Sequence, residues 1–276
     1  MIESLAHIFD NLDLTWIDSS KEILTSQIYT DLLSIFPNLK EIFQEGENND
    51  NDEFLRTIRH VIRAFKVFFL LKNGNFMYDS LSQNSLNTLR DKIKRIEEIN
   101  EKFLPLIFMY HDIGRFFDKK DHPFQSHVVI LNKELLDPFD LLDIEKLIID
   151  KIIQYHLLFA SIYTGEATYF GVYSILIDSE FVKLLSSEKY RELFVDLLEI
   201  FTYIDILGYS YAKIFDHYIK YFNEINRNLK QILKSWPDKN KALKKAADIS
   251  QDWIEWRISG AMRIFQFVET KSYLTR

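Results

Sequence analysis

An imidazole and a carboxylate stand side by side where an apolar segment ends. The stretch Tyr110-His111-Asp112-Ile113-Gly114-Arg115 follows the hydrophobic run 103–109. Burying such polar groups costs several kcal/mol unless they are paired or bind a metal. Adjacent side chains on a helix diverge by about 100°. His111 and Asp112 could therefore occupy different positions around one metal, or Asp112 could bridge two.

Other histidine and aspartate residues also fall on apolar faces of helical patterns, where a buried imidazole or carboxylate needs a partner. Imidazole and carboxylate groups without thiolates suit Mn, Fe, Co, Ni or Zn, and carboxylates extend the range toward Mg. We therefore expect one or two divalent metal ions. The residues are His60 in the pattern 54–71, His127 in a helix that opens near residue 124, His156 in 141–158, and Asp205 in 190–207.

The composition predicts the elements that must position these side chains. The chain has 276 residues, 47% of them hydrophobic and 15% aromatic, and only 7 Gly and 5 Pro interrupt it. So few turn-forming residues favour long helices over a β architecture with many turns. We predict a single all-α domain over residues 1–276, with the metal site in the core of a compact bundle.

Charge and cysteine content exclude several classes of function. The net charge of −7 makes duplex nucleic acid an unfavourable partner. The absence of cysteine removes disulfides, thiolate nucleophiles and Cys-ligated zinc. The first residues lack the pattern of a signal peptide, and the apolar runs are far shorter than the roughly 20 residues that cross a bilayer. We expect a cytoplasmic protein without a membrane partner.

The ordered pattern His, His-Asp, His, His, Asp resembles the HD-domain superfamily of metal-dependent phosphohydrolases, over about residues 54–220. The segment 110–115 resembles its defining motif, and His60 followed by Arg63 is similar to its first-helix motif. The resemblance implies an HD-like core with an N-terminal helical extension at 1–50 and C-terminal helices at 221–276. The long gap between His60 and His111 marks 73–100 as an inserted segment, which reads as a loop leading into an exposed helix.

Carried over by position, the resemblance implies a binuclear site. His60, His111, Asp112 and Asp205 would hold one metal. A second would be held by His127 and His156, with Asp112 bridging the two and acting in catalysis. Two metals can share a hydroxide and neutralise the charge of a phosphoryl displacement.

Cationic residues close to these ligands in sequence could either contact a phosphate group or lie solvated on the surface. They are Arg63, Arg115 and Lys119, with Lys120 beside them. The stretch 121–127 also resembles the His-Pro-Pro-Phe-Gly-His segment of deoxynucleoside triphosphohydrolases, with an insertion before it. His122 is therefore either a catalytic or phosphate-binding residue, or a histidine on the surface.

Four functions agree with these features. The first is a phosphatase or phosphodiesterase acting on a nucleotide or another small phosphorylated metabolite. The same four-His, two-Asp set also resembles that of di-iron oxygenases on this fold, such as myo-inositol oxygenase and phosphonate-cleaving enzymes. A non-enzymatic sensing role is the third, and nuclease action on single-stranded nucleic acid is the fourth. The C-terminal apolar stripe of Trp253, Trp256, Ile264 and Phe267 could pack in the core or pair two copies as a homodimer.

Overall fold

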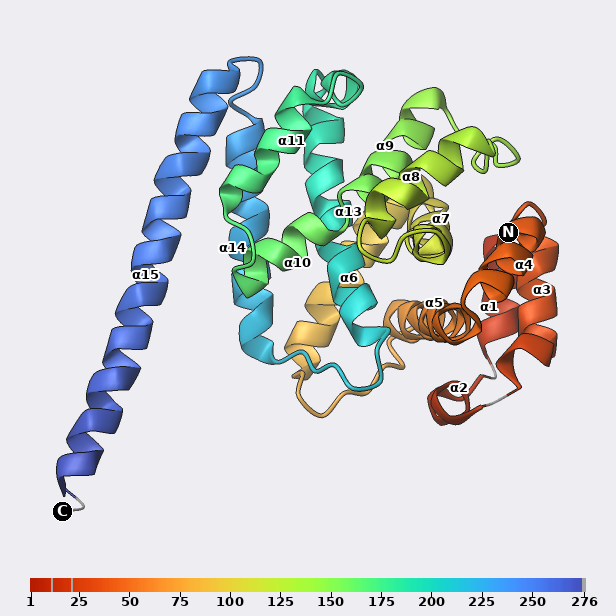
Figure 1. Cartoon of the computed structure of the whole chain (residues 1–276), viewed down its shortest axis with the longest axis horizontal. Helices are drawn as coiled ribbons and strands as arrows, with labels where there is room; N and C mark the ends of the chain where they lie inside the picture. Colours follow the sequence, from red (N-terminus) through yellow and green to blue (C-terminus); the bar gives the residue numbers. More distant parts are fainter. Residues whose placement is uncertain (11, 21, 275–276) are drawn as a thin grey trace.

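The computed structural model describes residues 1–10, 12–20 and 22–274, with side chains as far as Gln266. Every regular element in this part of the chain is a helix, which confirms the all-α prediction (Figure 1). The α-helices are α1 Ile2–Asp10, α2 Leu14–Ser19, α3 Gln27–Ile35, α4 Leu39–Asn49, α5 Asn51–Lys72, α6 Gln83–Asn100, α7 Phe103–Tyr110, α8 His122–Asn132, α9 Asp143–Gln154, α10 Leu157–Thr164, α11 Val172–Ile177, α12 Val182–Leu185, α13 Glu188–Leu207, α14 Asp216–Leu233 and α15 Lys239–Leu274. Short 3₁₀ turns lie at Ile23–Thr25, Ile113–Phe116 and Tyr169–Gly171.

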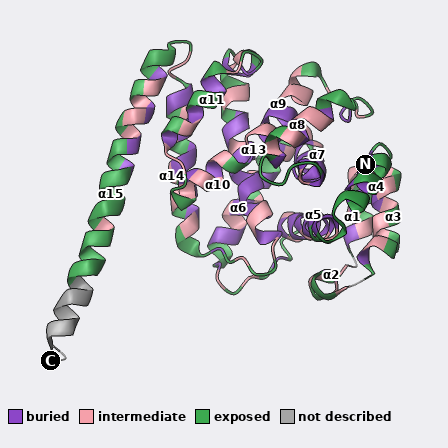
Figure 2. Ribbon diagram, in the orientation of Figure 1, coloured by how far each residue is buried: buried purple, intermediate pink, exposed green. Residues whose placement is uncertain are grey.

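Three helices, α5, α7 and α13, form the centre of the molecule and contact one another. All eight residues of α7 are buried, as expected for a helix that is hydrophobic on every side. Figure 2 shows the same burial along much of α5 and α13. α5 begins at a side-chain cap, where Asp50 accepts a hydrogen bond from the backbone N–H of Glu53 at 3.0 Å.

The N-terminal helices α1 to α4 pack against α5 and share its hydrophobic core. The ring of Phe9 stacks on Phe65 with 5.3 Å between centroids, and the buried amine of Lys66 donates to the carbonyl oxygen of Phe9 at 2.7 Å. α5 starts at Asn51, close to the boundary that we predicted between the extension and the core.

The segment 73–100 differs in part from the expected loop and exposed helix. α6 is amphipathic, and its apolar face is buried against α5 and α13. The loop before it is tied to the α13–α14 connection, because the hydroxyl of Tyr78 donates to the carbonyl of Ala212 at 2.7 Å and the N–H of Ser82 donates to Asp216 at 2.8 Å. This segment therefore holds the connection between α13 and α14, which follows Asp205, in place.

The C-terminal helix α15 packs on α14 and on the turn Tyr169–Gly171, and it lies along one edge of the molecule (Figure 1). Trp253 is buried, whereas Trp256 and Ile264 are exposed, so the predicted stripe is only partly used in the core. The side chain of Phe267 lies outside the described residues. Among the helices described here, none is both long and apolar enough to span a membrane.

Candidate metal centre

His111 and Asp112 follow the last residue of α7 and are almost fully buried, with 1% and 3% of their surfaces exposed. The hydroxyl of Ser126, on α8, donates to the carbonyl of His111 at 2.7 Å and accepts from the N–H of Gly114 at 2.8 Å. A Cβ on Gly114 would lie 2.2 Å from the carbonyl oxygen of His122. Only glycine fits at position 114, because the backbone at the start of α8 packs directly against it. This close approach brings the start of α8 to the His111-Asp112 pair.

One group of potential metal ligands consists of His60, His111 and Asp205, from α5, the end of α7 and α13. Their ligand atoms all lie within 4.8 Å of one another. Nε2 of His60 lies 2.8 Å from Oδ1 of Asp205, and Nε2 of His111 lies 3.4 Å from the same oxygen. The chain leaves α13 through Gly208, where a Cβ would lie 2.7 Å from the His60 ring. Tyr209 then stacks on His60 with 4.0 Å between ring centroids.

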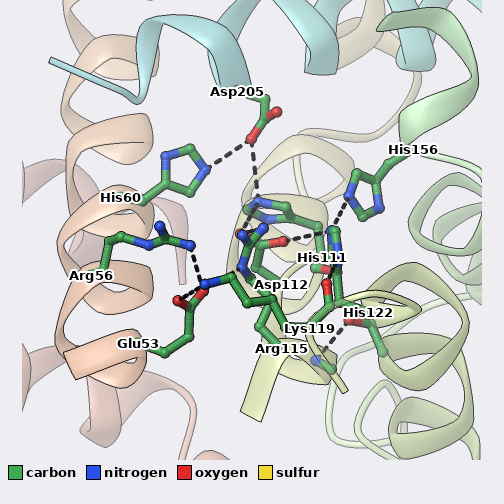
Figure 3. Close-up of polar contacts among 12 residues, drawn as sticks. Glu53, Arg56, His60, His111, Asp112, Arg115, Lys119, His122, His156 and Asp205 are labelled. Carbon is green, nitrogen blue, oxygen red and sulfur yellow. Dashed lines mark hydrogen bonds and ion pairs between the residues drawn. The ribbon is translucent and has the colours of Figure 1, made fainter. Parts of the chain in front are cut away.

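A second group consists of Asp112, His122 and His156, again with ligand atoms within 4.8 Å. Nε2 of His122 lies 3.2 Å from Oδ1 of Asp112 and 3.2 Å from Nε2 of His156. The other oxygen of Asp112, Oδ2, lies 3.5 Å from Nε2 of His111. Asp112 thus presents one oxygen to each group, and Figure 3 shows these side chains turned toward one another.

Backbone contacts fix which ring nitrogen carries hydrogen in three of the histidines. Nδ1 contacts the carbonyl oxygen three residues earlier in His111 (3.0 Å), His122 (3.1 Å) and His156 (2.7 Å). A carbonyl only accepts, so Nδ1 donates and Nε2 of the neutral ring presents a lone pair. Nε2 of His111 is buried without a hydrogen-bond partner, and those of His122 and His156 face each other. A cation between these atoms would remove the repulsion, so the two groups could hold metal ions.

The ionisation of the site agrees with a centre that attracts positive charge. Burial lowers the pKa of His156 to about 4 and also lowers that of His122, so both rings are in the neutral form that binds metal. Burial would raise the pKa of Asp205, but contacts with His111 and His60 outweigh it and hold the pKa well below its usual range. Burial likewise opposes a higher pKa of His111, yet Asp112 and Asp205 raise it.

His127 lies in neither group, although we predicted it as a ligand of the second metal. Its Nδ1 contacts Oδ1 of Asp150 on α9 at 2.7 Å. His122 and His127 are five residues apart on α8, which separates their directions by about 140°. The two side chains therefore cannot point to the same place, and the structure brings His122 to Asp112 and His156.

Next to the two groups of potential metal ligands, a cluster of three cationic side chains surrounds the buried carboxylate of Glu53. Oε1 of Glu53 accepts from Arg56 at 2.6 Å and from Nε of Arg115 at 3.0 Å, and Oε2 accepts from Lys119 at 2.7 Å. Arg115 in turn lies 3.6 Å from Oδ2 of Asp112. Burial opposes ionisation of Glu53, but hydrogen bonds from Lys119, Arg115 and Arg56 lower its pKa to about 2. We did not predict a role for Glu53 or Arg56; the only signal was their position beside the His60 face.

The predicted phosphate contacts differ in position. Arg115 and Lys119 lie in the cation cluster beside Asp112. Arg63 instead forms a two-point ion pair with Asp18 at 2.7 and 2.6 Å and contacts the carbonyl of Leu207 at 3.3 Å, so it joins α2, α5 and the end of α13. Lys120 is exposed.

Comparisons with protein-family models, curated proteins and solved structures give no match for this chain.

Proposed function

We propose that this protein is a metal-dependent phosphohydrolase of the HD type, which hydrolyses a phosphate ester of a nucleotide or another small metabolite. The observation that supports the proposal is the pair of opposed Nε2 lone pairs of His122 and His156 beside the carboxylate of Asp112. No hydrogen-bonding scheme within this pair satisfies both nitrogen atoms while the rings are neutral.

In this proposal His60, His111, Asp112 and Asp205 would hold one divalent ion, and Asp112, His122 and His156 would hold a second. The donors are imidazole and carboxylate only, which suits Mn, Fe, Co, Ni or Zn and, less well, Mg. When bound, such ions supply positive charge for a phosphoryl displacement and lower the pKa of water enough to give a nucleophile near neutral pH. The backbone carbonyls behind the histidines keep each ring oriented for ligation.

The cation cluster provides the phosphate contacts of the proposed reaction. The side chains of Arg56 and Lys119 are about half exposed, at 51% and 57%, so both can reach a ligand in solvent. Arg115 is held between Glu53 and Asp112, where its guanidinium can bind phosphate oxygens next to the metal groups. The side chain of Asp205 is 21% exposed, which makes it the most accessible of the ligands in the two groups.

The test is turnover of a panel of phosphate mono- and diesters by metal-free protein supplied with Mn, Mg, Co or Ni. We expect turnover that depends on the added ion. Stoichiometric metal binding with no ester cleaved under any condition would rule the proposal out.

The ligand set also supports a second candidate, a di-iron oxygenase. The two groups together contain four histidines and two aspartates, the same residue types as the di-iron oxygenase set that the sequence resembles. Near-stoichiometric iron in the purified protein with oxygen consumption would favour it. Hydrolysis supported by Mg or Zn would exclude it, because neither ion is redox active.

A further inference from the structure

A basic groove lies between α6, α13 and α14, although the protein has a net charge of −7. Two adjoining cavities of about 380 and 400 Å³ form it and share Glu192, Asn226 and Lys230. None of the metal-group residues lines either cavity. Along α13, Asp196 in the groove precedes Asp205 by nine residues, or about 14 Å of helix.

A network of polar contacts, centred on the buried side chains of Glu199 and Asn226, links the three helices beneath the groove. Glu199 is fully buried and accepts from Lys92 at 2.6 Å. The amide of Asn226 donates to Glu199 at 2.7 Å and to Asp196 at 2.8 Å. Lys230 donates to both oxygens of Asp196, at 2.7 and 2.8 Å. The charges of this network are therefore balanced within the protein.

The rim of the groove carries cations that the protein does not neutralise. Lys234 lies 3.9 Å from Glu188, but four other cations form no ion pair with any described carboxylate. Only Glu192 opposes these four among the remaining lining residues, which leaves an excess of three positive charges. The four cations are Arg95, Lys189, Arg191 and Arg227.

An apolar wall lies in the same cavity as Arg95 and Lys189. Ile96 and Leu193 form its buried part, and Ile99 is 42% exposed although it is a large aliphatic residue. A site with an apolar wall and a rim of cations suits a ligand that has a flat apolar part and several negative charges.

We propose that this groove binds a nucleoside diphosphate at a site separate from the metal centre. The diphosphate lies at the rim cations, and the base lies against Ile96, Ile99 and Leu193. The excess of three positive charges matches a diphosphate group, and the cavity volumes fall within the range of small-molecule sites. A long polyanion fits less well, because the net charge of the protein repels it. The site does not depend on the proposed hydrolase activity.

The test is titration calorimetry of the full chain with ADP in EDTA, which keeps divalent ions from the metal centre. We expect one site whose affinity falls at least about tenfold in the double variant Arg95→Glu, Arg227→Glu. Lys94→Glu is the matched control, because Lys94 is an exposed neighbour on α6 that lines neither cavity, and it should change the affinity less than about twofold. Pyrophosphate should bind more weakly than ADP, because it lacks a base to contact the apolar wall.

Three results would overturn the proposal. The first is the absence of ADP binding by the unaltered protein. The second is an equal loss of affinity in the double variant and in Lys94→Glu. The third is binding that Asp112→Ala abolishes while the double variant retains it, since this would place ADP in the metal centre. Circular dichroism of each variant shows whether a loss of binding reflects a loss of folding.

Discussion

The Nε2 atoms of His122 and His156 lie 3.2 Å apart, although a backbone carbonyl contacts Nδ1 of each ring. Two neutral imidazoles in this arrangement oppose their lone pairs, and burial of both rings excludes the water that could relieve the repulsion. The pKa of His156, lowered to about 4 by burial, disfavours a shared proton near neutral pH. The pair is best satisfied by a cation, which is why we place the second metal here.

Placing the second metal here gives different roles to His122 and His127, two histidines of α8. His122→Ala should remove metal from the second group and lower the metal content by about one ion per chain. His127→Ala should leave the metal content unchanged, because His127 contacts Asp150 instead. The measurement is elemental analysis of both variants after equal loading with Mn. If His127→Ala lost metal and His122→Ala kept it, His127 would be the ligand, as predicted from the sequence.

Glu53 should act through the cations that it holds. Glu53→Gln weakens the contacts to Arg56, Arg115 and Lys119, so we expect a higher KM for phosphate esters with a smaller change in kcat. The change keeps the size of the side chain. Steady-state kinetics separate this role from a purely structural one, which would lower the amount of folded enzyme without raising KM.

The same carboxylate makes stability depend on pH. The folded-state pKa of Glu53 is about 2, below the ordinary value of 4.5, so its contribution is fully present above about pH 4.5 and is lost as the pH falls toward 2. We expect Glu53→Gln to lower the free energy of unfolding at pH 7 by on the order of 2 kcal/mol. In acid, the free energies of unfolding of the variant and the unaltered protein should differ by less. Urea unfolding at pH 7 and pH 3 measures both values. Equal losses at the two pH values would contradict the ion cluster.

Gly208 is required for His60 to reach Asp205. A Cβ at this position would lie 2.7 Å from the His60 ring, so Gly208→Ala should displace the imidazole and weaken metal binding in the first group. Overpacking of this kind costs about 1–3 kcal/mol of stability. Gly260→Ala on α15 is the control, because its Cβ would meet no atom within 4 Å, and it should raise stability by up to ~1 kcal/mol. Metal titration and thermal unfolding test both variants.

Pairing of two copies of the chain is one of the two expectations for the C-terminal stripe, and the exposed residues of α15 allow it to be tested. Ile258, Met262, Ile264 and Phe265 are each more than half exposed, an unusual density of apolar side chains on a single helix. Ile258→Glu combined with Phe265→Glu should shift the protein from dimer to monomer in sedimentation velocity. An unaltered protein that sediments as a monomer at micromolar concentration would contradict this pairing.

The residues of the two candidate groups, apart from His122, could be picked out from the sequence because they lie on or at the end of apolar patterns. His60, His156 and Asp205 were expected on the apolar faces of helices, and the pair His111-Asp112 at the end of a buried segment; the structure places all five in the two candidate groups. His122 could not be separated from His127, since the choice depends on how the loop 117–121 turns into α8. The ion pair of Arg63 with Asp18 could not be predicted, because Asp18 lies 45 residues earlier, in a helix whose position the periodicity of the sequence does not determine.

The most direct test of the central claim is phosphate-ester turnover by metal-free protein to which one divalent ion at a time is returned. The proposed function predicts that turnover appears with at least one of Mn, Mg, Co or Ni and is absent in Asp112→Ala, because Asp112 presents one oxygen to each metal group. Full metal binding without cleavage of any ester, or equal turnover in Asp112→Ala, would contradict it.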